Sequence, residues 1–204
     1  MRKKNKIYLI LMGMIVIAAI AAVFLLLRWR GSKVLHPSED IKSATEVVFY
    51  RQDDSKWAKD TLGDSSYTLK SSGCLVSCIA SAVSMMDGNI ETPESLNKEF
   101  SRQNVYDGEG NLLWGRLNDT GTFKAQVYQE VSSQILVDDL KEGKYPIVRV
   151  RMHGIGNFHY VLIVKAEDGM FYCMDPLADE LQPLSAYGNR IYAIRCVYTD
   201  AHSL

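Results

Sequence analysis

The sequence predicts an α+β fold, with an N-terminal helical part packed on a C-terminal antiparallel β-sheet and one transmembrane helix before both. Three observations support this prediction. Residues 7–27 are apolar, residues 74–143 contain segments of helical periodicity, and residues 146–198 contain β-branched and aromatic runs separated by turn residues. The 204 residues leave room for one domain of ordinary size and an appendage.

The apolar run at residues 7–27 contains no charged side chain. As a helix it would measure about 31 Å, which matches a hydrocarbon core of about 30 Å. A cleaved signal peptide is the alternative, but its apolar region has only about 7–15 residues and ends at a small-residue site. Here the alanine-rich residues 18–22 lie inside the run, which leads into Arg28. We therefore expect residues 1–30 to form a cytoplasmic stub and an uncleaved transmembrane signal-anchor.

Basic residues flank the apolar run on both sides, four before it and Arg28, Arg30 and Lys33 after it. The positive-inside rule favours a cytoplasmic N-terminus by a small margin. The rest of this single-pass protein of the cell membrane would then be extracytoplasmic. The mostly polar residues 31–45 are expected to form an extracytoplasmic tether, and residues 46–200 the globular domain.

Charge is unevenly distributed along the chain, although the formal net charge is only −1. Residues 1–33 hold seven basic side chains and no acidic one, so residues 34–204 have a net charge of −8. Phosphate groups would repel such a domain, so we expect no nucleic-acid partner. The expected contact of the N-terminal run is the membrane.

Cys74 stands where a glycine-bearing loop meets a predicted amphipathic helix over residues 74–86. Apolar residues recur there at helical spacing on one face, and Asp87-Gly88 provides a C-terminal stop. The first turn of a helix has free backbone N–H groups and the positive end of the helix dipole, which favour an anion such as a thiolate. Cys74 is therefore a candidate nucleophile. The alternative is a buried structural cysteine.

The other predicted elements follow the order of helices first and strands second. The expected helices cover residues 94–102, 112–118 and a segment that Ser133 caps and Gly143 ends. The expected strands cover residues 46–50, 146–152, 158–164, 170–175 and 191–198. A tight hairpin is expected at Glu167-Asp168-Gly169.

One of the four histidines is placed to act as a rigidly held base. His36 lies in the expected tether and His202 among the last residues, where we expect mobile side chains, and His153 lies in a glycine-rich loop. His159 stands near the start of a predicted strand, whose backbone can hold the ring in place. Its alternative interpretation is a half-buried histidine without a catalytic role.

The predicted hairpin brings Asp175 beside His159. His159 is nine residues before Asp168 and Asp175 is seven after it, so antiparallel pairing places the two at one edge. A thiol nucleophile needs a base to hold its proton and a third group to orient that base. Asp175 followed by Pro176 could instead only end the strand.

Four short motifs together resemble those of papain-fold cysteine peptidases related to the double-glycine leader peptidases of bacterial bacteriocin exporters. They are residues 52–58 (QDDSKWA), 72–74 (SGC), 159–163 (HYVLI) and 175–176 (DP), and the resemblance covers about residues 46–198. It implies a papain-like fold with four functional residues: Cys74 as nucleophile, His159 as general base and acid, Asp175 as orienting group, and Gln52 as oxyanion donor beside the Cys74 N–H. The alternative for Gln52 is a surface polar residue.

The chain departs from this family directly after the nucleophile. Relatives usually have Gly and Pro there, whereas this chain has Leu75-Val76-Ser77. A helix continues easily through these residues, so catalysis is not excluded, but substrate approach beside Cys74 is expected to be more crowded.

The four cysteines would permit two disulfides outside the cytoplasm. Cys173 and Cys196 lie on predicted strands that could be neighbours, whereas Cys78 faces the core one turn after Cys74. A disulfide at Cys74 would exclude the enzyme. No cysteine and histidine spacing fits a structural zinc site, so we expect neither a metal nor a cofactor.

These inferences predict a membrane-anchored, extracytoplasmic cysteine peptidase or amidase. It would hydrolyse a peptide-type bond in a peptide or peptidoglycan-type substrate through a thioester. The alternative is a catalytically inactive papain-fold ectodomain that binds a peptide or a surface partner. A third interpretation is a cell-wall endopeptidase of the NlpC type, which also has a cysteine at a helix start before a histidine strand but no upstream glutamine motif.

Overall fold

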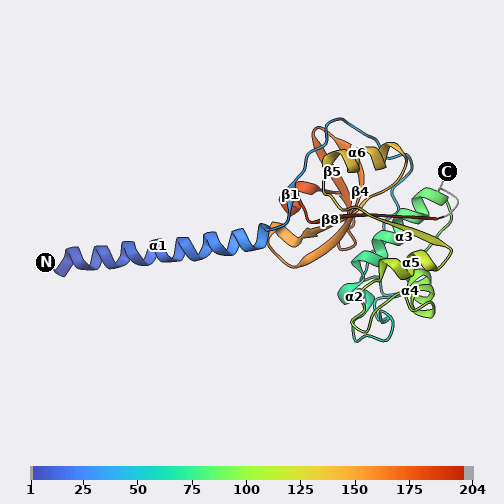
Figure 1. Ribbon diagram of the computed structural model, residues 1–204, viewed down its shortest axis with the longest axis horizontal. Helices are drawn as coiled ribbons and strands as arrows, with labels where there is room; N and C mark the ends of the chain where they lie inside the picture. The colour runs from blue at the N-terminus through green and yellow to red at the C-terminus, as the bar shows by residue number, and fades with distance from the viewer. Residues whose placement is uncertain (1, 200–204) are drawn as a thin grey trace. The chain divides into compact units, whose positions relative to one another are not determined.

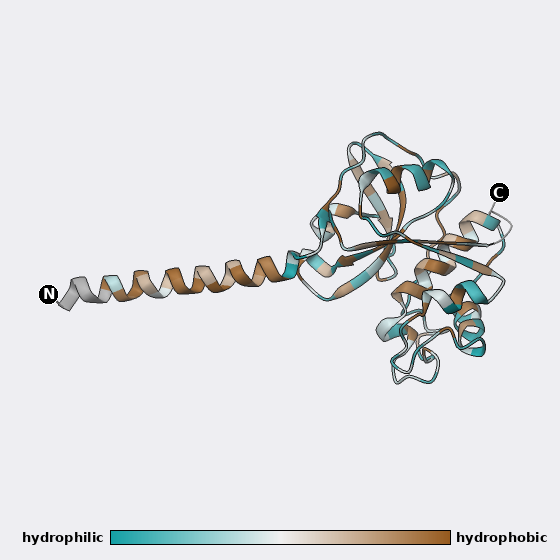
Figure 2. Cartoon of the chain, viewed as in Figure 1, coloured by the Kyte–Doolittle hydropathy of each residue, from teal (hydrophilic) through white to brown (hydrophobic). Residues whose placement is uncertain are grey.

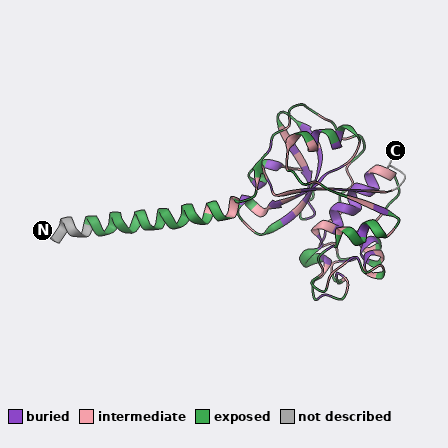
Figure 3. Cartoon of the chain, viewed as in Figure 1, coloured by how far each residue is buried: buried purple, intermediate pink, exposed green. Residues whose placement is uncertain are grey.

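The computed structural model describes residues 2–199, with side chains from residue 7 onward. The chain forms two compact units that divide between Ser32 and Lys33. The first unit is helix α1 (Arg2–Trp29). Among the described residues it is the one helix long and apolar enough to span a membrane, over Ile7–Trp29. Apolar residues cover it from residue 7 to residue 27 (Figure 2), and most of them are exposed (Figure 3).

An antiparallel sheet of six strands dominates the second unit, in the order β2-β8-β3-β4-β5-β6. Its strands are β2 (Phe123–Val127), β3 (Ile147–Arg151), β4 (Phe158–Glu167), β5 (Met170–Met174), β6 (Gln182–Pro183) and β8 (Ala193–Thr199). A two-stranded sheet pairs β1 (Lys33–Val34) with β7 (Arg190–Ile191). The expected α+β class with an antiparallel sheet is confirmed.

Five α-helices belong to the second unit as it is described. They are α2 (Leu69–Ser72), α3 (Cys74–Asp87), α4 (Pro93–Arg102), α5 (Trp114–Asp119) and α6 (Ser133–Lys141). Gly88 ends α3 in the left-handed conformation, as its sequence predicted. The cap of α6 is Ser132 and not Ser133, because the Ser132 hydroxyl accepts from the Ile135 N–H at 3.3 Å. Two short 3₁₀-helices, η1 (Met152–Gly154) and η2 (Leu184–Tyr187), complete the unit.

Helix α3 is the centre of the second unit. It packs against β4 and β8 on one side and against α4 on another, and Figure 1 shows it between the sheet and the smaller helices. Residues 76–85 are therefore all buried (Figure 3), whereas the sequence predicted one buried face. The serines and alanines on its other faces are small enough for this close packing.

The hairpin between β4 and β5 forms as expected. Asp168 and Gly169 adopt φ values of 51° and 71°, which suit a two-residue turn of the type that matches strand twist. The strand expected over residues 46–50 is absent from the described structure, because this segment runs along the surface without a ladder of strand pairing. Strand β2, which the sequence did not predict, pairs with β8 instead.

The residues expected to form a free tether pack onto the second unit, so that expectation is wrong for residues 33–45. Strand β1 pairs with β7, and Leu35 is buried in the core. Ile41 forms a bridge with Ala166, and the Thr45 hydroxyl lies 3.1 Å from that of Tyr145. The compact unit thus begins at Lys33 and not at residue 46.

All four cysteines are free thiols. Strands β5 and β8, which carry Cys173 and Cys196, are separated in the sheet by β4 and β3. The strands expected to be neighbours are therefore not adjacent, and the disulfide considered for them does not form. Cys78 is fully buried in the core, as its place on the helix predicted.

Candidate active site

Cys74 is the first residue of α3 and lies half-buried at the edge of a cleft. Gly73 separates α3 from α2, and a Cβ added to Gly73 would lie 2.5 Å from the Leu69 carbonyl oxygen. Glycine is therefore needed where the two helices meet. This close junction places the Cys74 thiol at the start of α3, where backbone N–H groups lack partners within the helix.

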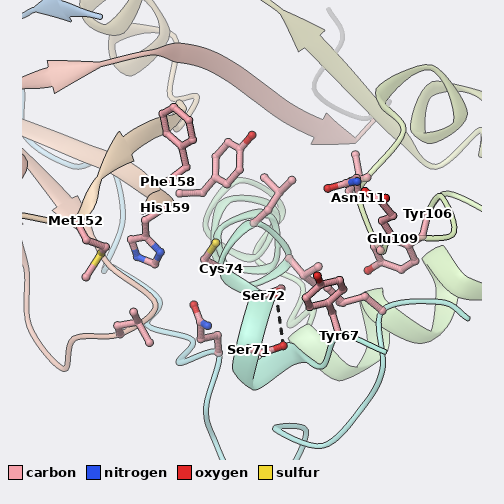
Figure 4. Close-up of a pocket in the computed structure, with 18 of the residues that line it drawn as sticks. Tyr67, Ser71, Ser72, Cys74, Tyr106, Glu109, Asn111, Met152, Phe158 and His159 are labelled. Atoms are coloured by element: carbon pink, nitrogen blue, oxygen red, sulfur yellow. Dashed lines mark hydrogen bonds between the residues drawn. The ribbon is translucent and has the colours of Figure 1, made fainter. Parts of the chain in front are cut away.

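His159 lines the same cleft and forms a buried pair with Asp175. Each is only 4% exposed, and the His159 Nε2 lies 2.7 Å from the Asp175 Oδ1. Since Asp175 occupies Nε2, Nδ1 is the ring nitrogen left for Cys74. Figure 4 shows the Cys74 sulfur, at the start of α3, facing the His159 ring.

His159 and Asp175 each favour the charged form of the other. Burial lowers the pKa of His159, but hydrogen bonding to Asp175 and Cys74 and the negative charges of both outweigh it and raise the pKa to about 9. Burial raises the pKa of Asp175, but its bond to His159 and further hydrogen bonds hold it below its ordinary value. An imidazolium beside a carboxylate is therefore the favoured state of the pair.

Tyr187 is a member of the site that the sequence did not reveal. Its hydroxyl donates a hydrogen bond to the Asp175 Oδ2, and the Leu177 N–H donates to Oδ1 at 2.8 Å. Both carboxylate oxygens are thus held in place. Tyr187 lies in η2, 12 residues after Asp175, and carries no local motif.

Gln52 lines the cleft with Cys74 and His159 and is only 4% exposed, so it is not a surface residue. Its backbone N–H donates to the Pro176 carbonyl at 3.0 Å, which ties it to the segment after Asp175. The side-chain Nε2 donates to the Lys70 carbonyl at 2.7 Å, and Oε1 is buried without a partner among the described residues. Because an amide nitrogen has two hydrogens, a second donor remains for the cleft.

The cleft has a volume of about 470 Å³ and runs between two sets of side chains. Figure 4 shows Met152, Phe158 and His159 on one side of Cys74, and Tyr67 and Glu109 on the other. Leu75 and Val76 also line it. The two residues directly after Cys74 therefore belong to the wall of the cleft.

The other histidines of the described chain lie outside the cleft. His36 and His153 are exposed, and His202 lies outside the described residues. Within residues 2–199 no three His, Cys, Asp or Glu side chains gather in a way that could hold a metal ion. The structure therefore brings together Cys74, His159, Asp175 and Gln52, and adds Tyr187.

No protein-family model matches the chain, and no curated protein matches it. Among solved structures, the chain is similar to a crystal structure from Bacillus anthracis whose own assignment, a C39-like peptidase, is provisional. The two are 15% identical with a TM-score of 0.49, and the match covers 78% of this chain and 98% of that one. A likeness at this level concerns the fold at most and carries no residue role across.

Proposed function

We propose that the chain is a membrane-anchored, extracytoplasmic cysteine peptidase or amidase of papain-like fold. The observation that carries the proposal is that Cys74 and His159 line one cleft and that His159 is paired with the buried Asp175. A thiol, an imidazole and a carboxylate in this order are the groups that nucleophilic catalysis requires.

In the proposed reaction the Cys74 thiolate attacks the carbonyl carbon of a peptide-type bond, and the carbonyl oxygen takes the electron pair. Nδ1–H of the His159 imidazolium then protonates the amine as the C–N bond breaks, which leaves a thioester on Cys74. Neutral His159 next accepts a proton from water, whose oxygen attacks the thioester. The C–S bond breaks, the acid product leaves, and the thiolate and imidazolium are restored.

Asp175 and Gln52 have supporting roles in this scheme. Asp175 orients the ring so that Nδ1 faces Cys74, and its carboxylate stabilises the imidazolium. The Gln52 amide and the Cys74 backbone N–H would donate to the oxygen that becomes negative in the tetrahedral intermediate. The hydrogen bond from the Gln52 backbone N–H to the Pro176 carbonyl supports this role, since it holds Gln52 beside the segment that follows Asp175.

Helix α1 supports the membrane part of the proposal, because it is apolar on all sides and has no polar face to turn toward water. Alkaline extraction of membranes and the intact mass of the extracted chain test it. Retention with residues 1–30 still attached is expected for an anchor, whereas a chain released without them would be a processed secreted protein.

A catalytically inactive, peptide-binding domain is the second candidate. Leu75 and Val76 favour it, since these bulkier side chains line the cleft directly after Cys74, where the peptidases that the motifs resemble usually have Gly and Pro. This candidate keeps the cleft but needs no reactive thiol. The two candidates therefore differ in the chemistry of Cys74.

Alkylation of the full-length chain in a neutral detergent separates them. Iodoacetamide at pH 6 is expected to modify Cys74 much faster than an ordinary thiol, and His159→Ala is expected to remove the difference. The buried thiols of Cys78, Cys173 and Cys196 serve as internal controls when the modified peptides are identified by mass spectrometry. Incubation with a mixture of capped peptides then tests hydrolysis, with Cys74→Ala as control. If Cys74 is alkylated no faster than an ordinary thiol and no peptide is hydrolysed, the peptide-binding domain is the candidate that remains.

A further inference from the structure

We propose that Arg149 and Arg195, two neighbouring cations on the sheet face beside the cleft, bind a carboxylate of the peptide substrate. This inference rests on the proposed function and adds a substrate class to it. Nothing in the catalytic scheme requires either arginine.

Strand register places the two arginines on one face of the sheet. Arg149 on β3 is paired with Tyr160 on β4, and Arg195 on β8 is paired with Ile147, two residues before Arg149. Directly paired residues, and residues two apart on a strand, share a face. Arg149, Tyr160 and Arg195 therefore project from the same surface.

Three aromatic side chains, Trp114, Phe158 and Tyr160, connect these cations to the cleft and are called the aromatic wall below; all three line the cleft. The Arg149 guanidinium lies 4.1 Å from the Phe158 ring centroid, and the Arg195 guanidinium lies 5.7 Å from that of Trp114. Contacts of this kind hold a guanidinium in place beside an aromatic ring. Each cation thus contacts a ring that lines the cleft.

Neither arginine forms an ion pair with a carboxylate among the described residues. The Nε of each is buried without a hydrogen-bond partner, and a side-chain nitrogen of Arg195 donates only to the Ile194 carbonyl, at 2.7 Å. By contrast, Arg51 and Lys141 of the same unit are paired with acids. Two cations with buried, unused donors are costly without an anion, and a carboxylate matches the fork of a guanidinium.

The charges of Arg149 and Arg195 also affect the pKa values of neighbouring groups. Burial lowers the pKa of Arg195, and the charge of Arg149 lowers it further. Burial raises the pKa of Tyr160, whereas the charges of Arg149 and Arg195 and a hydrogen bond with Arg149 lower it. Because Tyr160 lines the same cleft as Cys74, an anion bound beside Tyr160 fits a group of a molecule held in the cleft, which favours a substrate group over a separate ligand.

The negative charges of the rest of the domain indicate which way round a substrate would lie in the cleft. Residues 34–204 carry a net charge of −8, so anions are repelled in general and a positive site must act locally. Glu109 lines the side of the cleft opposite Phe158 (Figure 4). We therefore expect an acidic group on the side of the aromatic wall and none on the Glu109 side.

Binding tests the site without turnover. The full-length Cys74→Ala chain in a neutral detergent is titrated with two capped pentapeptides, Ac-Ala-Ala-Glu-Ala-Ala-amide and its Gln twin. The change in tryptophan fluorescence, to which Trp114 contributes beside Trp29 and Trp57, is followed. The Glu peptide is expected to bind about 10- to 100-fold more tightly, and more weakly as salt rises. A Gln peptide with a free C-terminal carboxylate shows whether the bound group is a side chain or a chain end.

Variants identify the arginines. Arg149→Met and Arg195→Met keep the apolar stem against each ring but lose the charge, and the preference for Glu is expected to fall to about twofold or less. Arg116→Gln on α5 is the matched control, since it removes an exposed positive charge two residues from Trp114. It is expected to keep the preference, and thermal unfolding checks that each variant is folded.

The outcomes separate this inference from the proposed function. Equal binding of the Glu and Gln peptides, or an equal effect of Arg116→Gln, would overturn the carboxylate site even if Cys74 is reactive. Arginine-dependent binding of Glu by a chain that cuts no peptide would keep the site and reject the enzyme. Binding to phosphatidylglycerol vesicles that needs both arginines, without any peptide preference, would show a lipid site and overturn the proposal.

Discussion

His159 and Asp175 point toward the same face of the sheet because β4 contains a one-residue bulge. The Nε2 and Oδ1 atoms lie 2.7 Å apart. The register between β4 and β5 shifts by one residue between the pairs Lys165–Tyr172 and Ile163–Cys173. The extra residue in β4 is the buried Val164.

Without the bulge, Asp175 would lie opposite Leu162, whose side chain points to the other face from His159. With it, the register continues to Val161, which shares a face with His159. A slip of one residue moves every side chain of a strand to the opposite face. The bulge therefore decides whether the acid reaches the imidazole.

Asp175→Asn is expected to lower peptide hydrolysis by about a hundredfold or more, because the imidazolium loses its charged partner. The pH profile gives a sharper test. His159 has a pKa of about 9, so the acid form that protonates the leaving amine is lost as the pH rises through that value. Removing the Asp175 charge lowers this pKa, so the alkaline limb of kcat/KM should move to lower pH. If the alkaline limb of kcat/KM stays at the same pH, the proposed effect of Asp175 on the pKa of His159 is wrong.

Tyr187→Phe is expected to lower kcat/KM by about tenfold and to shift the same alkaline limb to lower pH. The change leaves the Asp175 Oδ2 buried without its donor, which favours the protonated acid and weakens its hold on His159. Tyr145→Phe is the matched control, since Tyr145 is equally buried and its hydroxyl faces Thr45. If both variants lose the same stability and neither shifts the alkaline limb of kcat/KM, Tyr187 stabilises the fold but does not position Asp175.

Gln52→Ala is expected to lower kcat by about 10²- to 10³-fold with little change in KM, as for the loss of one oxyanion donor. Steady-state kinetics on a cleaved peptide measures it, and thermal unfolding shows whether the loss of the bond to the Lys70 carbonyl destabilises the fold. An active variant would argue for the NlpC-type interpretation, which needs no glutamine at this position.

Asp139→Asn is expected to raise the free energy of unfolding by about 2 kcal/mol at pH 8 and to change it little at pH 4.5. Asp139 is buried, Tyr128 donates to its Oδ1 at 2.5 Å, and burial raises the pKa from 3.8 to about 6. A raised pKa stabilises the fold below the unfolded value of 3.8, and this contribution is lost as the pH rises through about 6.

Denaturant unfolding at the two pH values measures the effect of Asp139→Asn. The exposed neighbour Asp138 provides the control, since Asp138→Asn removes the same charge from α6 without removing it from the core. A stability gain that is equal in both variants, or equal at both pH values, would contradict the role assigned to burial.

Local signals carried the correct sequence predictions. The spacing of apolar residues and Gly88 predicted α3, and Asp168-Gly169 predicted the hairpin, because both depend on residues close in the chain. The missed features depend on distant partners. Strand β2 exists through its pairing with β8, and residues 33–45 are held by β7 and Ala166.

The sequence by itself determined the order of elements, the apolar helix α1 and the candidate residues Gln52, Cys74, His159 and Asp175. Counting residues from the turn placed His159 and Asp175 near each other, but only the tertiary structure decided that they share a face. The bulge in β4, the contact of the Tyr187 hydroxyl with Asp175 and the placement of Arg149 and Arg195 on one sheet face arise from register and packing between separate segments. Such contacts depend on which strands become neighbours, and no local propensity encodes that choice.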